Sequence, residues 1–407
     1  MARSLAFWFD DEPAKNTYDV DLHINFWSFD SEKVNYLDIG VLVKSKKESI
    51  SNNINIYFPF KITHDDYFSE LGSLVCSDRE LISAIFNTNI SKTQADSKND
   101  IFKIEFSPKN KLSFHTQILP ETDDSEGGVK LKAFNENTSI SKERGTILKF
   151  PSELFQSTDG KATDEEFRTD YFRFRIKLSQ DSKNILGPEY SPKGSFITNY
   201  FNSTEMIDFR INEPRNLPSK IRAKLNESLK LKQVHFFLIR DANAEFKMSH
   251  SKYKRCRILE NNIWKKYLKL GVPTSHWWEE KLKKHCRISF SKLKLPEQML
   301  IYHWAENSNE DYKNGVSIDH FSAFAKFSQR KTGFFRMASV VLFVLSLGVT
   351  ASILANILMV PLDNVWNSIS KSVESSDSPV PDIEYQGQES KNSNRIFKDE
   401  ATKNDCE

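Results

Sequence analysis

The chain has 407 residues, of which 39% are hydrophobic and 28% charged, and its formal net charge is +2. This composition excludes a chain that is disordered throughout, because it carries enough apolar side chains to build folded domains. The four cysteines, Cys76, Cys256, Cys286 and Cys406, are too widely spaced for a disulfide framework or a zinc motif, which favours a reducing compartment for most of the chain.

The first region of the chain is predicted to be rich in strands. In residues 18–29, apolar Val20, Leu22 and Ile24 alternate with polar side chains, as in a strand with one buried face. Short helices are expected near 63–66 and at 81–86. Further strands are expected at 33–44, 54–62, 101–107, 111–119, 129–134 and 145–150. Many short strands between turn residues indicate an antiparallel sandwich, so we predict a β-rich cytosolic domain over residues 1–156.

A second domain of mixed α and β structure is predicted for residues 157–250. Strands at 206–211 and 234–239 flank a helix at 218–229. The clearest strand lies at 171–178, where apolar and basic residues alternate. Its basic face carries Arg173, Arg175 and Lys177. These cations would meet an anionic ligand, lie in solvent, or pair with acidic side chains on the next strand.

A basic block follows, with thirteen Lys and Arg residues but only three acidic ones between residues 252 and 294. We predict helices at 255–270, 275–286, 298–308 and 317–330, and hence a basic helical stalk over residues 251–336. Its cations would bind anionic lipid, grip nucleic acid or simply be solvated. Nearness in sequence to the apolar span described next favours lipid over nucleic acid. The candidate lipid- or anion-binding residues are Lys254, Arg255, Arg257, Lys265, Lys266, Lys269, Lys283, Lys284 and Arg287.

Residues 337–362 contain no Asp, Glu, Lys or Arg and are predicted to form one transmembrane helix. Lys331 and Arg336 precede this span, and Asp363 and Glu374 follow it. The positive-inside rule therefore predicts a single-pass protein of the cell inner membrane with a cytoplasmic N-terminus. The polar residues 363–407 are predicted to be a disordered tail on the outer side.

Small residues recur within the predicted span. Gly348 and Ser352 are four residues apart, as are Ala351 and Ala355, so each pair lies on one side of a helix. Small side chains let two membrane helices approach closely, which predicts self-association through this helix. The alternative is that such residues are simply common in membrane helices.

A possible nuclease-like set begins just after the predicted strand 234–239. Asp241, Glu245 and Lys247 resemble the Asp…Glu-x-Lys arrangement of the PD-(D/E)xK nuclease superfamily, with Asp208 on an earlier strand as a replacement for Asp241. The resemblance implies two carboxylates that hold Mg²⁺ and a lysine that stabilises a developing phosphate charge. The superfamily usually separates the Asp from the Glu-x-Lys by more residues, and a surface loop explains the same seven residues.

We therefore predict an α+β protein: a sandwich-like β-rich N-terminal domain, a mixed second domain, a helical basic stalk and one C-terminal transmembrane helix. No cofactor and no metal site are predicted, since no motif of that kind is found in the sequence. The leading function is a membrane-anchored sensor, adaptor or effector that binds a cytosolic ligand or partner; one version is a bacterial stress or phage-defence component. The alternatives are a membrane-tethered metal-dependent nuclease or other enzyme, and a lipid-surface scaffold.

Overall fold

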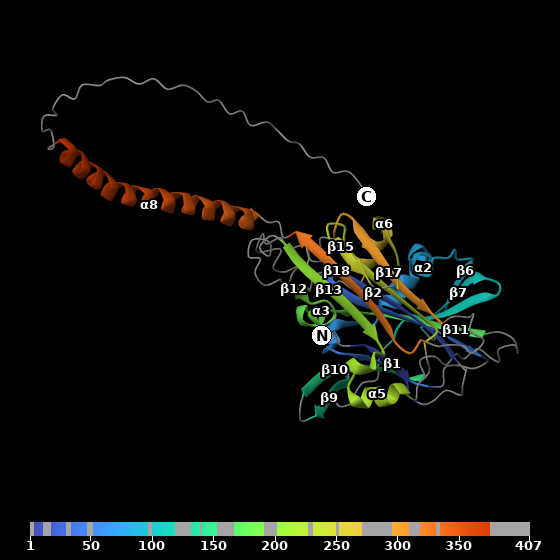
Figure 1. The fold of residues 1–407 in the computed structure, drawn as a ribbon. Helices are drawn as coiled ribbons and strands as arrows, with labels where there is room; N and C mark the ends of the chain where they lie inside the picture. The colour runs from blue at the N-terminus through green and yellow to red at the C-terminus, as the bar shows by residue number, and fades with distance from the viewer. Residues whose placement is uncertain are drawn as a thin grey trace, which may run out of the picture. The chain divides into compact units, whose positions relative to one another are not determined.

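The protein is described by a computed structural model in which the chain divides into two compact units, Met1–Lys331 and Thr332–Glu407 (Figure 1). The first unit is built mainly of β-sheet, and the second contains one long helix. The structure describes residues 4–10, 18–29, 34–46, 52–96, 100–118, 132–138, 141–152, 167–190, 202–226, 231–249, 252–270, 295–308, 318–330 and 334–374.

The largest element of the first unit is a ten-stranded mixed sheet. Strands β2 and β14 pair in parallel, as do β8 and β11, while the remaining pairs are antiparallel. β5 (Tyr67–Phe68) pairs with β11 off the main path. The main path runs through β16 (Tyr253–Ile258), β17 (Met299–Asn307), β14 (Gln233–Asp241), β2 (Tyr18–Phe29), β3 (Val34–Lys46), β11 (Phe167–Lys177), β8 (Asn110–His115), β7 (Ile101–Ser107) and β6 (Lys92–Asp96).

Two four-stranded sheets share the main hydrophobic core with one face of the large sheet. Buried Ile24 of β2 belongs to the same cluster as Ile56 from one small sheet and Phe209 from the other. This packing of sheet on sheet confirms a mixed α+β fold with mostly antiparallel pairing. The first small sheet has the order β1 (Ala6–Phe9), β4 (Ile54–Phe58), β10 (Ser141–Phe150), β9 (Lys132–Thr138). The second has the order β12 (Glu189–Tyr190), β13 (Asn202–Ile211), β18 (Phe321–Arg330), β15 (Glu245–Ser249).

Helices contribute to the second hydrophobic cluster of the unit, on the opposite face of the large sheet. Trp27 of β2 is buried together with Leu71, Leu81 and Trp264, which belong to three helices. Since side chains alternate along a strand, Trp27 and its neighbour Phe26 enter different cores. The three helices are α1 (Leu71–Cys76), α2 (Arg79–Phe86) and α6 (Asn261–Lys269). Shorter elements elsewhere are α3 (Gln180–Leu186), α5 (Ser219–Asn226), η1 (His64–Asp66) and η3 (Pro214–Asn216).

The predicted helices at 298–308 and 317–330 are wrong, because these residues form strands β17 and β18. In β18, Phe321, Ala323, Ala325 and Phe327 are buried at every second position, the period of a strand. Phe321 and Phe327 are six residues apart, a spacing that fits both the period of two and a helical spacing of three. Phe324 lies midway between them, so the three phenylalanines recur every third residue as in a helix, although Phe324 is only half-buried and lies on the other face of the strand.

The predicted helix at 255–270 is wrong in its first part. Tyr253–Ile258 forms strand β16, and only Asn261–Lys269 is helical. The predicted helix at 275–286 lies outside the described residues. The described part of the predicted stalk thus supplies β16, β17, β18 and α6 to the first unit, and strands from both sides of the predicted boundaries at 156 and 250 share its sheets.

The second unit contains α8 (Phe334–Glu374), a helix of 41 residues. Its stretch Met337–Ser372 is long and apolar enough to cross a membrane, and none of its most apolar part is buried. Residues 363–374 are helical, although the sequence predicted that the disordered tail begins at 363. Residues 375–407 lie outside the described residues.

Candidate functional site

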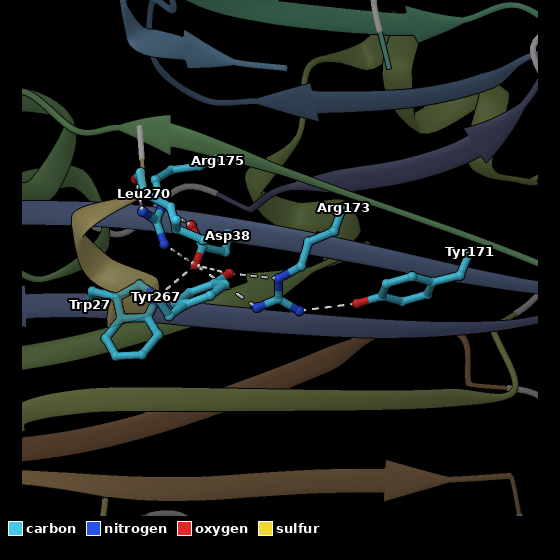
Figure 2. A network of polar contacts seen from close by, with 7 residues as sticks. All are labelled: Trp27, Asp38, Tyr171, Arg173, Arg175, Tyr267 and Leu270. Atoms are coloured by element: carbon cyan, nitrogen blue, oxygen red, sulfur yellow. Dashed lines mark hydrogen bonds and ion pairs between the residues drawn. The ribbon is translucent and has the colours of Figure 1, made fainter. Parts of the chain in front are cut away.

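The helix-covered face of the large sheet contains a buried polar network centred on Asp38 (Figure 2). Asp38 and Arg175 are opposite each other in the register of β3 and β11. The guanidinium of Arg175 donates two hydrogen bonds to the carboxylate, from Nε to Oδ1 at 2.7 Å and from Nη2 to Oδ2 at 3.0 Å. Oδ2 also accepts from Nε1 of Trp27 and from the hydroxyl of Tyr267, both at 2.7 Å. The carboxylate is therefore fully satisfied by donors from β2, β11 and α6.

The network keeps Asp38 ionised although no part of its side chain reaches solvent. Burial alone would raise the pKa of Asp38, but the charges of Arg175 and Arg173 and the hydrogen bonds from Arg175 and Tyr267 hold that pKa below its ordinary value. Burial acts against the charge of Arg175 as well, yet Asp38 and Tyr267 raise the pKa of its guanidinium. Each charge is thus retained because its partner is in place.

Arg173 extends the network along β11. Its Nε donates to the hydroxyl of Tyr267 at 2.8 Å, and its Nη1 donates to the hydroxyl of Tyr171 at 3.1 Å. Gly40 is opposite Arg173 in the register. A Cβ at Gly40 would overlap the hydroxyl of Tyr171 and lie 3.2 Å from Nη1 of Arg173. The absence of a side chain at this position lets both buried groups pack across β3.

The network also holds α6 against the sheet. Arg175 donates from Nη1 to the carbonyl of Leu270 at 2.9 Å, and Leu270 is the C-cap of α6. A guanidinium at this position is favourable, because the last carbonyls of a helix carry a partial negative charge. Tyr267 and Leu268 are fully buried beneath the helix. Strand β11 thus positions α6, whose outer side carries basic residues.

The three cations predicted on the strand at 171–178 divide between two surroundings. Arg173 and Arg175 are buried and share the acidic partner Asp38 on the next strand, which is one of the interpretations that the sequence left open. Lys177 is exposed. Asp38 itself was not predicted, since it lies 137 residues from Arg175 and no local pattern links the two. The signal in the sequence was that three cations alternate with large apolar residues along this strand, a pattern that fits a carboxylate on the neighbouring strand.

Three histidines lie beside this network on β2, β14 and β17. Nδ1 of His235 is 3.0 Å from Nε2 of His303, and the ring of His23 lies 5.3 Å from that of His235. Burial, followed by the charges of neighbouring groups, lowers the pKa of His23 to about 3. Burial likewise lowers the pKa of His235 to about 4, and burial and His235 lower that of His303 to about 4. All three rings are therefore neutral near pH 7.

Six of the nine predicted anion-binding residues lie on β16 and α6 and form what we call the basic face. Lys266 forms an ion pair with Asp78 at the N-cap of α2. The Nζ of Lys265 is 3.4 Å from the carbonyl oxygen of Glu297. The other four are exposed. The basic face consists of Lys254, Arg255, Arg257, Lys265, Lys266 and Lys269, whereas Lys283, Lys284 and Arg287 lie outside the described residues.

A groove of about 820 Å³ lies next to the basic face, between α2 and α6. This volume falls in the range of small-molecule sites, about 300–1,000 Å³. Its lining carries both signs of charge, with Arg79 and Glu80 from α2, Arg257 from β16 and Glu260 before α6. Trp264 supplies an apolar wall. The groove therefore adds a mixed polar and apolar surface to the cations around it.

The four nuclease-like residues are distributed over three strands. Asp208 pairs with Arg210 at 2.7 Å, and exposed Glu245 pairs with Lys247 at 2.6 Å. Asp208 and Glu245 lie on strands separated by β18, opposite Phe324 and Ser328. Strand geometry places them about 10 Å apart across the sheet and about 13 Å along it.

Asp241, the remaining carboxylate of that set, is buried at the end of β14 in the large sheet. It is separated from Glu245 by a turn in which the amide of Ala244 donates to the carbonyl of Asp241 at 3.1 Å. Within the part of the chain that the structure describes, no group of three His, Cys, Asp or Glu residues is arranged to hold a metal ion.

The predicted self-association residues all lie on α8. Gly348, Ala351, Ser352 and Ala355 are exposed, and a Cβ at Gly348 would have no atom within 4 Å. No protein-family model matches the chain, and no curated protein matches it.

Proposed function

We propose that this is a single-pass membrane-anchored protein whose first unit is a cytoplasmic module that binds an anionic ligand or partner. The observation that carries the proposal is the exposed apolar stretch of α8, Met337–Ser372. Leu342, Phe343 and Met359 are among its side chains that are more than 60% exposed. A hydrocarbon core of about 30 Å needs roughly 20 apolar residues, so α8 has length to spare.

The charges beside α8 support a cytoplasmic first unit. Lys326 and Arg330 lie on β18, and Lys331 and Arg336 complete the basic flank. Basic residues next to a span favour the cytoplasmic side, which corresponds to an inner-membrane protein with its C-terminus outside. Only residues 331–333 connect β18 to α8, so membrane insertion would tether the first unit to the membrane surface.

The basic face supports the binding part of the proposal. Lys254, Arg255 and Arg257 are exposed on β16 and have no acidic partner in the described part of the chain, whereas Lys252 beside them forms an ion pair with Glu306. The buried Asp38 network holds α6, which carries Lys265, Lys266 and Lys269, against the large sheet. Such a surface suits a sensor, adaptor or effector that recognises negative charge, and association of α8 helices would bring copies together.

The anchor is tested by membrane extraction of the full-length protein. We expect it to stay with membranes after an alkaline carbonate wash and to be released by detergent. Val349 lies near the middle of residues 337–362, which contain no Asp, Glu, Lys or Arg. Val349→Arg would place a charge at the bilayer centre, at a cost of about 2.5–3.5 kcal/mol on insertion scales. The variant should shift towards the carbonate-soluble fraction, whereas the matched variant Val349→Leu should not. A wild-type protein found in the soluble fraction without detergent would refute the anchor.

A further inference from the structure

The end strand of the large sheet has an unpaired edge. β16 is last in the strand order and pairs on one side only, with β17, among the residues that the structure describes. Five of its six side chains are exposed, the exception being half-buried Tyr253. Its sequence, Tyr-Lys-Arg-Cys-Arg-Ile, contains three cations and no acid. A strand edge with free backbone groups is a template for adding another strand.

The register shows which backbone groups point away from the sheet. The amide of Leu259 donates to the carbonyl of Met299 at 2.9 Å, which marks a hydrogen-bonded pair. Hydrogen-bonded and non-hydrogen-bonded pairs alternate in an antiparallel ladder, so Arg257 also exchanges its bonds with β17. Cys256 and Ile258, opposite Tyr302 and Leu300, then turn their N–H and C=O groups outward. This free edge offers a donor and an acceptor at each of two alternate residues.

The side chains along this edge would select the sequence of an added strand. Arg255 and Arg257 are opposite His303 and Ile301 in the register, so they lie on the helix-covered face of the sheet. Their positive charge contributes to the lowered pKa of His303. Cys256 and Ile258 lie on the other face, where Ile258 is 62% exposed. A complementary strand would carry acidic residues on the first face and apolar residues on the second.

We infer that the β16 edge binds an acidic partner polypeptide by strand addition, in which alternate acidic and apolar side chains face Arg255 and Arg257 on one side and Cys256 and Ile258 on the other. The main chain supplies the hydrogen bonds, and the alternating side chains supply specificity. The inference rests on the proposed function, because it names the partner of the binding module. Cations on an edge also repel a second copy of the same edge, so they favour an acidic partner over self-pairing.

The test is fluorescence anisotropy with the full-length protein in detergent and a fluorescein-labelled hexapeptide of alternating valine and glutamate. We expect saturable binding that weakens as salt rises, and at least tenfold weaker binding of the matching valine–lysine peptide. A valine–glutamate peptide N-methylated at the amides that face the edge keeps its charge but loses its donors, and it should also bind at least tenfold more weakly. Equal binding of the methylated peptide would overturn strand addition.

Variants of the edge give the complementary readout. Ile258→Pro removes an outward N–H without removing a bond to β17, and it should weaken peptide binding about tenfold, whereas Ile258→Val should leave it within about twofold. Arg257→Glu should weaken binding more than Arg257→Lys, and Lys269→Glu on α6 should change it little. Circular dichroism melts of each variant separate loss of binding from loss of folding.

Two other results would overturn the inference. In the first, neither peptide binds the wild-type protein, whereas vesicles containing phosphatidylserine bind the wild-type protein but not Arg257→Glu. The cations would then bind a lipid surface instead. If Lys269→Glu weakens peptide binding as much as Arg257→Glu does, the attraction is general to the basic face and no edge is involved. Both results leave the membrane extraction test unaffected, so failure of the inference is distinguishable from failure of the anchor.

Discussion

Replacing Asp38 by Asn is the most informative change in the first unit. The substitution preserves the shape of the side chain but removes the negative charge that two buried guanidiniums share. The new amide cannot accept the four hydrogen bonds that come from Arg175, Trp27 and Tyr267, and its NH₂ group would face donors. Arg173 and Arg175, each 2% exposed, would remain charged without a counter-charge.

The size of the effect follows from these contacts. Removing one partner of a buried ion pair costs about 3–5 kcal/mol, so we expect a loss of about 4 kcal/mol in the free energy of unfolding. For the unit Met1–Lys331, an unfolding entropy of about 2.1 cal/mol/K per residue gives about 0.7 kcal/mol/K in total. The midpoint of thermal unfolding should therefore fall by about 6 °C.

The assay is thermal unfolding of the full-length protein in detergent, followed by tryptophan fluorescence, since Trp27 and Trp264 lie at the network and report its packing. The matched control is Asp65→Asn, because the side chain of Asp65 is 99% exposed and its loss should shift the midpoint by less than 1 °C. If the unfolding midpoint of Asp38→Asn equals that of Asp65→Asn, the network does not hold α6 to the sheet and the prediction is refuted.

Three further predictions concern other buried groups. The unfolded chain binds protons at histidine near pH 6.5, while folded His23, His235 and His303 bind them only near pH 3–4, so stability should fall as pH decreases from 6.5 to 4. The slope should be about 1.4 kcal/mol per pH unit for His23, the most deeply buried of the three, and smaller for the half-buried His235 and His303, which solvent screens. His235→Phe should flatten that slope in urea titrations, and an unchanged slope in this variant would contradict the prediction. Gly40→Ala should destabilise the unit by about 1–3 kcal/mol through overlap with Tyr171, and adding Tyr171→Phe should recover part of the loss; full tolerance of Gly40→Ala would show that the site has room. Glu205→Gln leaves buried Lys183 and Arg240 facing a neutral amide, so it should lower the free energy of unfolding by about 3 kcal/mol in thermal melts. An unchanged melting midpoint would count against these ion pairs.

Local periodicity was enough to predict most strands of the first unit. The alternation in residues 18–29 predicts β2, which the structure places at Tyr18–Phe29, and the segment 101–107 matches β7. Over residues 18–26 of β2 and 102–106 of β7 the large apolar side chains lie on one face, so the period of two is visible in the sequence. β17 is different, because Ile301 and Trp304 are buried on opposite faces and its apolar residues run together without a clear period.

The candidate site was predictable only in part, because its geometry depends on strand order. The basic residues of β16 and α6 are evident from composition. The sequence predicted one helix for both segments, whereas the structure places some of these residues on an edge strand and the others on a helix. The free edge of β16 follows from its pairing with β17, which lies more than forty residues later in the chain. Asp38 was missed for the same reason, since pairing across the sheet joins residues that no local pattern connects.

Thiol labelling of the full-length protein in spheroplasts tests the membrane anchor and its orientation together. Cys256 is exposed in the first unit, Cys76 is buried and Cys406 lies near the C-terminus. A variant with Cys286→Ser and Cys406→Ser leaves Cys256 as the reactive thiol, and one with Cys256→Ser and Cys286→Ser leaves Cys406. With a membrane-impermeant maleimide, we expect Cys406 to react in intact spheroplasts and Cys256 to react only after permeabilisation. Labelling of Cys256 in intact spheroplasts, or of both thiols only after permeabilisation, would contradict the account.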